Sequence, residues 1–431
     1  MRNASLFERA VAVTPGGVNS GTRGLKEPIV WEAGEGAYLV DAEGKRYLDY
    51  HAAFGPIILG HNHPAVNAAV AQAMTRVDLT GVGTTELEIR LAEKVVEHVP
   101  SAEMALIFGS GTEATYLAGR LARAVTGRTK LIKFQGCFHG WHDYLLMNII
   151  SPPDKIGLKD PASAGMLPEA IDNTIVLPFN DSEAIESAVT AGGDEIAAII
   201  LEPIPHNIGC VLPNIEFVKT LRRLCDDHGI ILIFDEVITG FRHGLGGYQE
   251  KLGILPDLTT LAKAIANGYP CAVLAGRADL MMRFSSAGGD VFVGGTYNGH
   301  PVATSAALAT INELEDDAVY ERLFRLGDKA RRGLQEIADQ LDIDMTVAGY
   351  GSVFVPYFMS GPINRYQDLL RNNSEADVMF RTGMSARGIF MLPMAMKRNH
   401  ISAAHSEADI DHTLGVAEEV LKEMARNYGL R

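Results

Sequence analysis

Lys263 is the residue whose surroundings could give a side chain unusual chemical reactivity. It is the only basic residue in the largely apolar stretch 257–265. A lysine that loses its hydration has a lowered pKa, because burial disfavours the charged ammonium. The neutral amine is a nucleophile that forms Schiff bases with carbonyl compounds. The alternative is an ordinary lysine on a helical apolar stretch, with its amine extended to water, and residues 257–265 alone favour that alternative.

Asp235 is a candidate partner for a cationic ligand. It ends the apolar run 230–234, which is typical of a buried strand. A carboxylate at a buried strand end needs a cation or a hydrogen-bond donor beside it. A protonated ring nitrogen of a cofactor would meet that need, and the ring would then act as an electron sink for a carbanion. A structural arginine such as Arg242, or a helix N-terminus, is the alternative partner.

Residues 109–113, Gly-Ser-Gly-Thr-Glu, join a predicted strand to a predicted helix and could hold a phosphate. Small residues let backbone N–H groups point at an anion, and the helix N-terminus adds a favourable partial charge. The alternative is an ordinary helix start that Ser110 or Thr112 caps.

Residues 136–142, Gly-Cys-Phe-His-Gly-Trp-His, follow another predicted strand. The ring of Phe138 could stack on a planar cofactor, and packing in the core is the commoner alternative for a single phenylalanine. Cys137, His139 and His142 do not have the spacing of a zinc site, and no second pair of ligands accompanies them. We therefore expect no metal.

The middle of the chain alternates short apolar runs with helical patterns. The pattern predicts strands at residues 105–108, 130–134, 197–201, 230–234 and 271–276, and helices at 112–126 and 217–228. Continuously apolar strands that alternate with helices are typical of a mostly parallel sheet covered on both faces. Ligands gather at the carboxyl ends of the strands in such α/β sheets, which is where the candidate residues stand.

The two ends of the chain have different patterns. Residues 36–41 and 46–50 flank a turn-like segment and predict an antiparallel hairpin. From about residue 316 the chain is rich in helix, and its last helix is predicted near residues 409–428. We therefore expect a large domain at residues 60–310 and a smaller α+β domain built from residues 1–59 and 311–431.

The composition is that of a soluble globular protein, with 431 residues, 47% of them hydrophobic and 21% charged. A formal net charge of -15 argues against nucleic acid as a partner. The four cysteines are far apart and form no CxxC pair, which favours a reduced, cytoplasmic protein. We find neither the apolar core of a signal peptide nor a run of about 20 apolar residues that would span a membrane.

Six motifs stand in order along nearly the whole chain, from about residue 5 to residue 424. They are TPGGVNS at 14–20, LGHNHP at 59–64, SGTEAT at 110–115, FDEV at 234–237, LAK at 261–263 and GTYNGHP at 295–301. Together they resemble the class III aminotransferases of pyridoxal phosphate fold type I, most closely the group of glutamate-1-semialdehyde 2,1-aminomutase and its aminotransferase relatives. The resemblance implies a seven-stranded, mostly parallel sheet, pyridoxal 5'-phosphate as cofactor, and a homodimer with active sites at the interface.

The resemblance also implies a role for each matching residue. Lys263 would form the Schiff base, and Asp235 would pair with the pyridine nitrogen; these two would be the catalytic residues. The other cofactor contacts would be Ser110, Gly111 and Thr112 at the phosphate, Phe138 and Val237 on the two ring faces, His139, Glu202 and Asn207, and Thr296 reaching the cofactor of the neighbouring subunit. The substrate contacts would be Arg23, which would hold a carboxylate, and Phe54, Trp141 and Lys397.

One residue departs from the aminomutase pattern. The aminomutase has a glutamate before its Ser-x-Ala-His-Ser run; here that run is 402–406, and Lys397 takes the place of the glutamate, with Arg398 next. Such a cation would attract a second carboxylate or pair with an acid of a loop, and a solvent-exposed Lys–Arg pair is the alternative.

The sequence therefore predicts an aminotransferase that moves an amino group between an amino or β-amino acid and a keto acid. The aminomutase itself, a racemase on the same scaffold, and a non-catalytic protein that binds the cofactor are the alternatives. Small molecules are the expected substrates.

Overall fold

A seven-stranded sheet forms the centre of the protein in the computed structural model, which describes residues 2–428. Its strands, in spatial order, are β4 (Met104–Phe108), β10 (Ala272–Gly276), β9 (Leu258–Leu261), β8 (Ile231–Glu236), β7 (Ile196–Leu201), β5 (Lys130–Phe134) and β6 (Thr174–Leu177). β10 runs antiparallel to β4 and β9, and all the other neighbours are parallel. This confirms the predicted mostly parallel α/β sheet.

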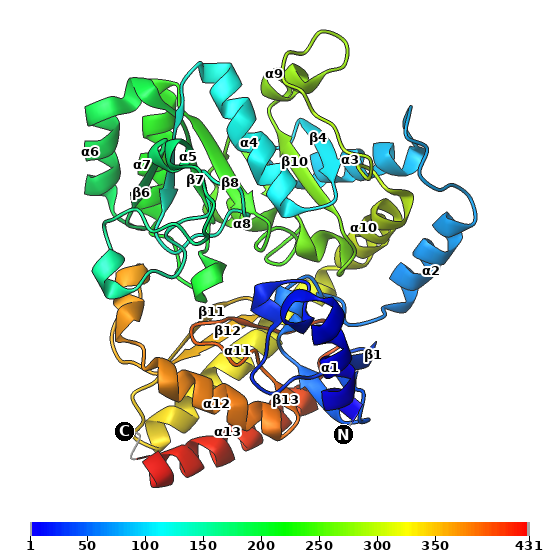
Figure 1. Ribbon diagram of the computed structural model, residues 1–431, viewed down its shortest axis with the longest axis vertical. Helices are drawn as coiled ribbons and strands as arrows, with labels where there is room; N and C mark the ends of the chain where they lie inside the picture. The colour runs from blue at the N-terminus through cyan, green and yellow to red at the C-terminus, as the bar shows by residue number, and fades with distance from the viewer. Residues whose placement is uncertain (1, 429–431) are drawn as a thin grey trace.

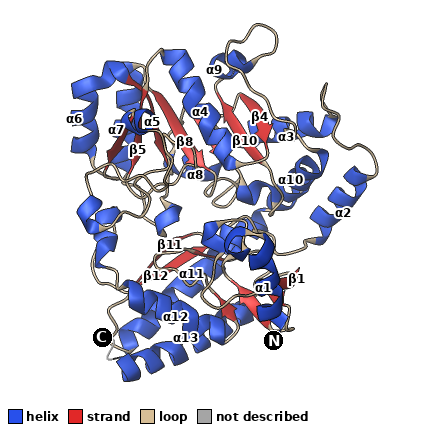
Figure 2. Ribbon diagram, viewed as in Figure 1, coloured by secondary structure: helices blue, strands red, loops and turns tan. Residues whose placement is uncertain are grey.

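Helices cover both faces of this sheet, as Figure 2 shows with red strands between blue helices. Consecutive side chains of β5 point to opposite faces: Leu131 packs in the cluster that contains α4 (Gly111–Thr126), and Ile132 packs with α7 (Ile215–His228). Apolar side chains are therefore needed at every position of the central strands. The remaining helices of this part are α5 (Pro168–Asp172), α6 (Ser182–Gly192), α8 (Gly247–Leu252) and α9 (Ala278–Met281).

A smaller α+β part is built from both ends of the chain, which lie together in the lower half of Figure 1. The predicted hairpin is present in a four-stranded sheet, where C-terminal β13 adds parallel to N-terminal β3. That sheet contains β1 (Trp31–Glu35), β2 (Tyr38–Asp41), β3 (Arg46–Asp49) and β13 (Ile389–Phe390); a second sheet contains β11 (Thr346–Tyr350), β12 (Val353–Tyr357) and β14 (Asn399–His400). The helices here are α1 (Arg2–Val13), α11 (Asp317–Gln340), α12 (Ser374–Ala386) and α13 (Glu407–Tyr428).

Three more helices connect the large sheet to the smaller part: α2 (Pro64–Met74) and α3 (Glu86–His98) precede β4, and α10 (Pro301–Leu314) follows β10. In space, α10 packs against both α2 and α3. The domain limits 60–310, 1–59 and 311–431 stay a proposal, which the membership of the sheets supports. Residue 1 and residues 429–431 of the predicted small domain lie outside the described residues. No helix within residues 2–428 is both long and apolar enough to cross a membrane.

The stretch around Lys263 corrects one sequence interpretation. Residues 258–261 form the buried strand β9, and Lys263 begins a short 3-10 turn, Lys263–Ala266, so the stretch is not an apolar helix. A short apolar run fits a buried strand and a helix equally well. Here the backbone pairing of residues 258–261 with β8 and β10 shows that they form a strand.

Candidate active site

The carboxyl ends of β4, β5, β7, β8 and β9 meet at one edge of the sheet. β4 and β9 run in the same direction, because both are antiparallel to the β10 between them. A cavity of about 150 Å³ opens at this edge. Eight of the predicted residues line it: Gly111, Thr112, Phe138, His139, Glu202, Asp235, Val237 and Lys263.

Lys263 stands directly after β9, and its backbone has a φ of +53°. Residues other than glycine rarely adopt this left-handed conformation, which costs on the order of 1–3 kcal/mol and is concentrated at functional sites. Burial, together with the positive charge of Arg398, lowers the pKa of the Lys263 amine to about 8. The structure thus places the amine of Lys263 on the cavity with a lowered pKa, and its role as the reactive group stays a prediction.

Asp235 is buried near the end of β8, and three donors hold its carboxylate. Oδ2 lies 2.7 Å from Nδ1 of His139, while Oδ1 accepts the N–H of Val237 (3.1 Å) and the hydroxyl of Thr260 (3.2 Å). Burial lowers the pKa of His139, so its ring is neutral at pH 7 and donates Nδ1–H to the aspartate. Arg242, the structural arginine considered as the alternative partner, instead binds Ser352 and backbone carbonyls.

Glu202 follows β7 and connects two loops at the cavity. Its Oε1 accepts the N–H of Phe138 (2.8 Å), and its Oε2 accepts the N–H of His206 (3.0 Å). Burial, with the nearby charge of Asp235, raises the pKa of Glu202 to about 7. Its contacts hold the backbone on which Phe138 stands.

The N-terminus of α4 forms another wall of the cavity. Ser110 caps the helix, since its hydroxyl accepts the N–H of Glu113 (3.4 Å) and bonds its carboxylate (2.7 Å). Ser110 is therefore the N-cap, the alternative interpretation of this segment, and Gly111 and Thr112 line the cavity. A Cβ at Gly111 would lie 3.0 Å from a methyl of Val237, and one at Gly140 would lie 2.8 Å from Oγ1 of Thr112.

These contacts test whether the residues fit a phosphorylated, planar cofactor. Two positions beside the helix N-terminus are glycines, and a Cβ at either would press on Val237 or Thr112, which line the cavity. The first N–H groups of a helix have no intrahelical acceptor and favour an anion. With an amine and a carboxylate on the same cavity, the donors and acceptors suit pyridoxal phosphate.

Lys397, Arg398 and Phe54 lie on the C-terminal side of this site. The amine of Lys397 donates to the carbonyl of Asn207 (2.9 Å), whose side chain bonds the carbonyl of Gly136 (3.3 Å). Burial and the charge of Arg398 lower the pKa of Lys397 to about 8. Arg398 is 7% exposed and donates to the carbonyls of Phe54 and of His206. The interpretation of a solvent-exposed Lys–Arg pair is therefore wrong, because both side chains bond backbone across the fold.

Seven predicted residues do not line the cavity within this chain. Four of them, Ser110, Asn207, Phe54 and Lys397, have the contacts described above, and the other three are Arg23, Trp141 and Thr296. Arg23 lies on the 3-10 turn Gly21–Arg23 and lines a separate cavity of about 700 Å³ beside α1. Trp141 is 73% exposed and lines a cleft of about 330 Å³, which shares Thr112 with the site. Thr296 is exposed on the loop before α10. Their roles at a substrate or at a partner's cofactor remain predictions.

Sequence reasoning missed several residues of this site. Thr115 and Gly140 line the cavity, and the hydroxyl of Thr115 also bonds the carbonyl of His139 (2.7 Å). Thr115 lies four residues after Gly111, so helical periodicity could have placed both on one face. Arg398 has no such local signal, because its partners are far away in the sequence.

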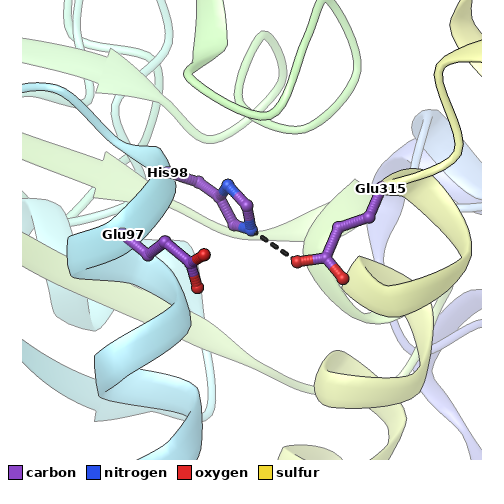
Figure 3. Close-up of side chains that lie close together, drawn as sticks. All are labelled: Glu97, His98 and Glu315. Atoms are coloured by element: carbon purple, nitrogen blue, oxygen red, sulfur yellow. Dashed lines mark hydrogen bonds and ion pairs between the residues drawn. The ribbon is translucent and has the colours of Figure 1, made fainter.

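The two histidines of residues 137–142 have partners other than a metal. His139 binds Asp235, and His142 lies 3.3 Å from the hydroxyl of Thr115. Within residues 2–428, the one group of three close metal-ligand side chains is Glu97, His98 and Glu315, which Figure 3 shows. The amine of Lys94 also binds Glu315 (2.5 Å), so this cluster is a network of ion pairs between α3 and the end of α10.

Comparisons with known proteins agree with this geometry. The model of the family Aminotransferase class-III matches residues 21–408. A glutamate-1-semialdehyde 2,1-aminomutase of Rhodopirellula baltica is 43% identical over 98% of this chain and 96% of its own. An omega-transaminase of Sphaerobacter thermophilus superposes with a TM-score of 0.93 at 33% identity, over 99% of this chain and 98% of that one. A beta-phenylalanine aminotransferase of Variovorax paradoxus superposes with a TM-score of 0.89 at 28% identity, over 99% of this chain and 94% of that one.

The chain belongs to the class III aminotransferase family. It is therefore an enzyme of that pyridoxal phosphate-dependent class, with the fold of its solved relatives. The predicted family, fold type and cofactor are confirmed, and the non-catalytic alternative is not supported.

Proposed function

We propose that this enzyme moves an amino group between a carboxylate-bearing amine, either an amino acid or a β-amino acid, and a keto acid. The observation that carries the proposal is the cavity at the carboxyl edge of the sheet. The amine of Lys263, the carboxylate of Asp235 and the N-terminus of α4 line this one space. They offer a nucleophile, an acceptor for a ring N–H, and an anion site.

Each residue of the cavity would contact a different part of the cofactor. Lys263 would hold it covalently through Nζ, Asp235 would accept its ring N–H, and Gly111 and Thr112 would donate backbone N–H groups to its phosphate. Phe138 and Val237 would cover the two faces of the ring. Pyridoxal phosphate supplies a ring that stabilises negative charge on the substrate carbon.

Lys263 would also move the proton that transamination requires. With the cofactor bound, the neutral amine of Lys263 would act as the base that takes the proton from the substrate carbon and passes it to the cofactor. A pKa of about 8 suits a base that works near neutral pH. His139 and Thr260 would keep the carboxylate of Asp235 in place during this step.

A second carboxylate of the substrate would bind on the C-terminal side, in addition to the one that Arg23 would hold. Lys397 and Arg398 are cations whose hydrogen-bond acceptors are carbonyl groups and an imidazole nitrogen rather than carboxylates. An anionic substrate group would supply the missing negative charge. Arg23, Phe54, Trp141 and, from a partner subunit, Thr296 complete this proposal; the homodimer and the cytoplasmic location stay predictions.

A glutamate-1-semialdehyde 2,1-aminomutase is the second candidate function, because a relative of that name is 43% identical over 98% of this chain. The two functions differ in their need for a co-substrate. A mutase converts the semialdehyde without an added keto acid, whereas an aminotransferase needs an acceptor in every cycle. Assay of the semialdehyde alone, and then of a panel of amines with keto acids, separates them.

The direct test of the proposal is reduction of the cofactor-loaded enzyme with borohydride, followed by peptide mapping. We expect the label on Lys263, loss of label and of amino transfer in Lys263→Ala, and neither loss in Lys251→Ala, which changes an exposed lysine of α8. A label on another lysine, or turnover by Lys263→Ala at the wild-type rate, would contradict the assignment.

A further inference from the structure

Lys133 is a buried lysine that the proposed chemistry does not use. Its side chain has no exposure to solvent, although it stands on β5 only a few residues before the cavity-lining loop. Its amine donates to the carbonyls of Cys137 (2.9 Å), Leu145 (3.1 Å) and Met147. An ammonium has three donors, so each finds an acceptor.

All three acceptors belong to the loop 135–148, which carries Phe138 and His139. This segment has no helix or strand of its own. Gln135 and Asn148 close its base, since each side chain bonds the other residue (3.1 Å for both bonds). Lys133 lies inside the loop that this pair closes and ties its two limbs together.

The peptide group between Cys137 and Phe138 is held from both sides. Its carbonyl accepts from the ammonium of Lys133, and its N–H donates to the carboxylate of Glu202 (2.8 Å). Two buried side chains, one basic and one acidic, therefore fix the plane of this one peptide. Bonds to charged groups are stronger and shorter than neutral ones, so the plane is held firmly.

The orientation of that peptide determines where the next two side chains lie. Phe138 lines the cavity, and His139 reaches Asp235 at 2.7 Å. The carbonyl of His139 accepts from Thr115 of α4, so the loop is docked on the helix directly after this residue. A rotation of the peptide would move Phe138 and would weaken the bond between His139 and Asp235.

Stability alone gives little reason for a lysine at this position. Burying an ammonium without a carboxylate partner costs free energy that an apolar side chain of similar length would avoid. Burial also lowers the pKa of Lys133 to about 8, which reflects that cost.

We propose that Lys133 is a positioning residue for the active site: through the Cys137–Phe138 peptide it places Phe138 against the cofactor and His139 against Asp235. The inference rests on the function proposed above for Phe138, His139 and Asp235. It assigns to Lys133 no contact with cofactor or substrate.

The test compares Lys133→Met, which keeps the length and removes the donors, with Lys130→Met on the same strand. Lys130 binds the surface acid Glu195, so its variant controls for the chemical change. Hydrogen–deuterium exchange of peptides from 136–147 and from α7 reports local and distant order. We expect exchange in 136–147 to rise about tenfold or more in Lys133→Met while α7 changes little.

Cofactor binding and kinetics give the second readout. We expect the Kd of pyridoxal phosphate to rise and kcat to fall about tenfold each in Lys133→Met, with KM for the amine nearly unchanged. Wild-type exchange in 136–147, or an equal rise in α7, would overturn the proposal. The exchange measurement needs no cofactor. Its result therefore tests the role of Lys133 independently of the borohydride labelling of Lys263, which tests the proposed function.

Lys133→Gln covers the case in which Lys133→Met does not fold. It keeps two N–H donors and removes the charge, and we expect the same local rise in exchange at a smaller size. If both variants are insoluble while Lys130→Met is soluble, Lys133 is required by the fold as a whole, and the positioning role is overturned.

Discussion

Gly111→Ala tests the shape of the cavity at the start of α4. The added Cβ would lie 3.0 Å and 3.2 Å from the two methyl groups of Val237 and 3.7 Å from Cβ of Ala262. The first two distances are too short for ordinary contact, so Val237 must shift, and we expect it to shift into the cavity that it lines, where the ring of the cofactor would lie. Without cofactor the methyl groups have room to move, whereas with cofactor the overlap costs about 1–3 kcal/mol.

The cost should therefore appear in cofactor binding and not in folding. An overlap of this size weakens the affinity for pyridoxal phosphate by about 5- to 150-fold, at about 1.4 kcal/mol per factor of ten. The melting temperature of the cofactor-free protein should stay the same or rise, because alanine favours a helix over glycine by up to about 1 kcal/mol. Absorbance titration with pyridoxal phosphate and thermal unfolding measure the two effects.

Two further variants separate the overlap from other causes. Gly111→Ala/Val237→Ala removes the methyl groups that the new Cβ would touch, and we expect it to recover most of the lost affinity. Gly415→Ala makes the same change in α13, where a Cβ meets nothing within 4 Å, and it should bind cofactor like the wild type. Tight binding by Gly111→Ala, or no recovery in the double variant, would refute the reasoning.

Two other predictions concern the substrate and the effect of pH. Lys397→Met should raise KM for a dicarboxylic keto acid about tenfold, and less for a monocarboxylic one, because a charge-assisted bond is lost; initial rates with both acids check this, and equal effects would argue against carboxylate binding. Burial lowers the pKa of His405 to about 4. Between pH 6.5 and 4, His405 is therefore protonated in the unfolded chain but neutral in the folded one, so the free energy of unfolding decreases as the pH is lowered. His405→Gln should remove about 3 kcal/mol of the loss between pH 6.5 and 4; urea unfolding across this range measures it, and an unchanged slope would contradict it.

Much of the fold could be predicted because the central strands are buried on both faces. Residues 196–201 of β7 are all buried, so this strand is apolar at every position because helices cover both faces of the sheet. The turn between β4 and α4 was equally visible, since its small residues and the cap Ser110 are local features. Asp235 stood out because it follows such a run at the edge where ligands gather.

The rest depends on contacts that a local pattern does not contain. Residues 258–261, Leu-Thr-Thr-Leu, are too short a segment to distinguish a strand from a helix, and only the pairing with β8 and β10 shows that they form a strand. The strand β6 (Thr174–Leu177) was missed, because it is four residues long and lies at the edge of the sheet. Arg398 bonds His206, 192 residues away, and no spacing in the sequence reveals that contact.

The charges of the site show what kind of ligand it favours. Glu202, Arg398 and Lys133 bond mainly to backbone groups, so they hold the surrounding loops without neutralising one another directly. Burial, and after it the charge of Arg398, lowers the pKa of both Lys263 and Lys397, so Arg398 repels both of these cations. A phosphate at α4 and a carboxylate on the substrate would each relieve part of that repulsion. Under the proposed function, this field would favour an amine that carries a carboxylate over a simple alkylamine.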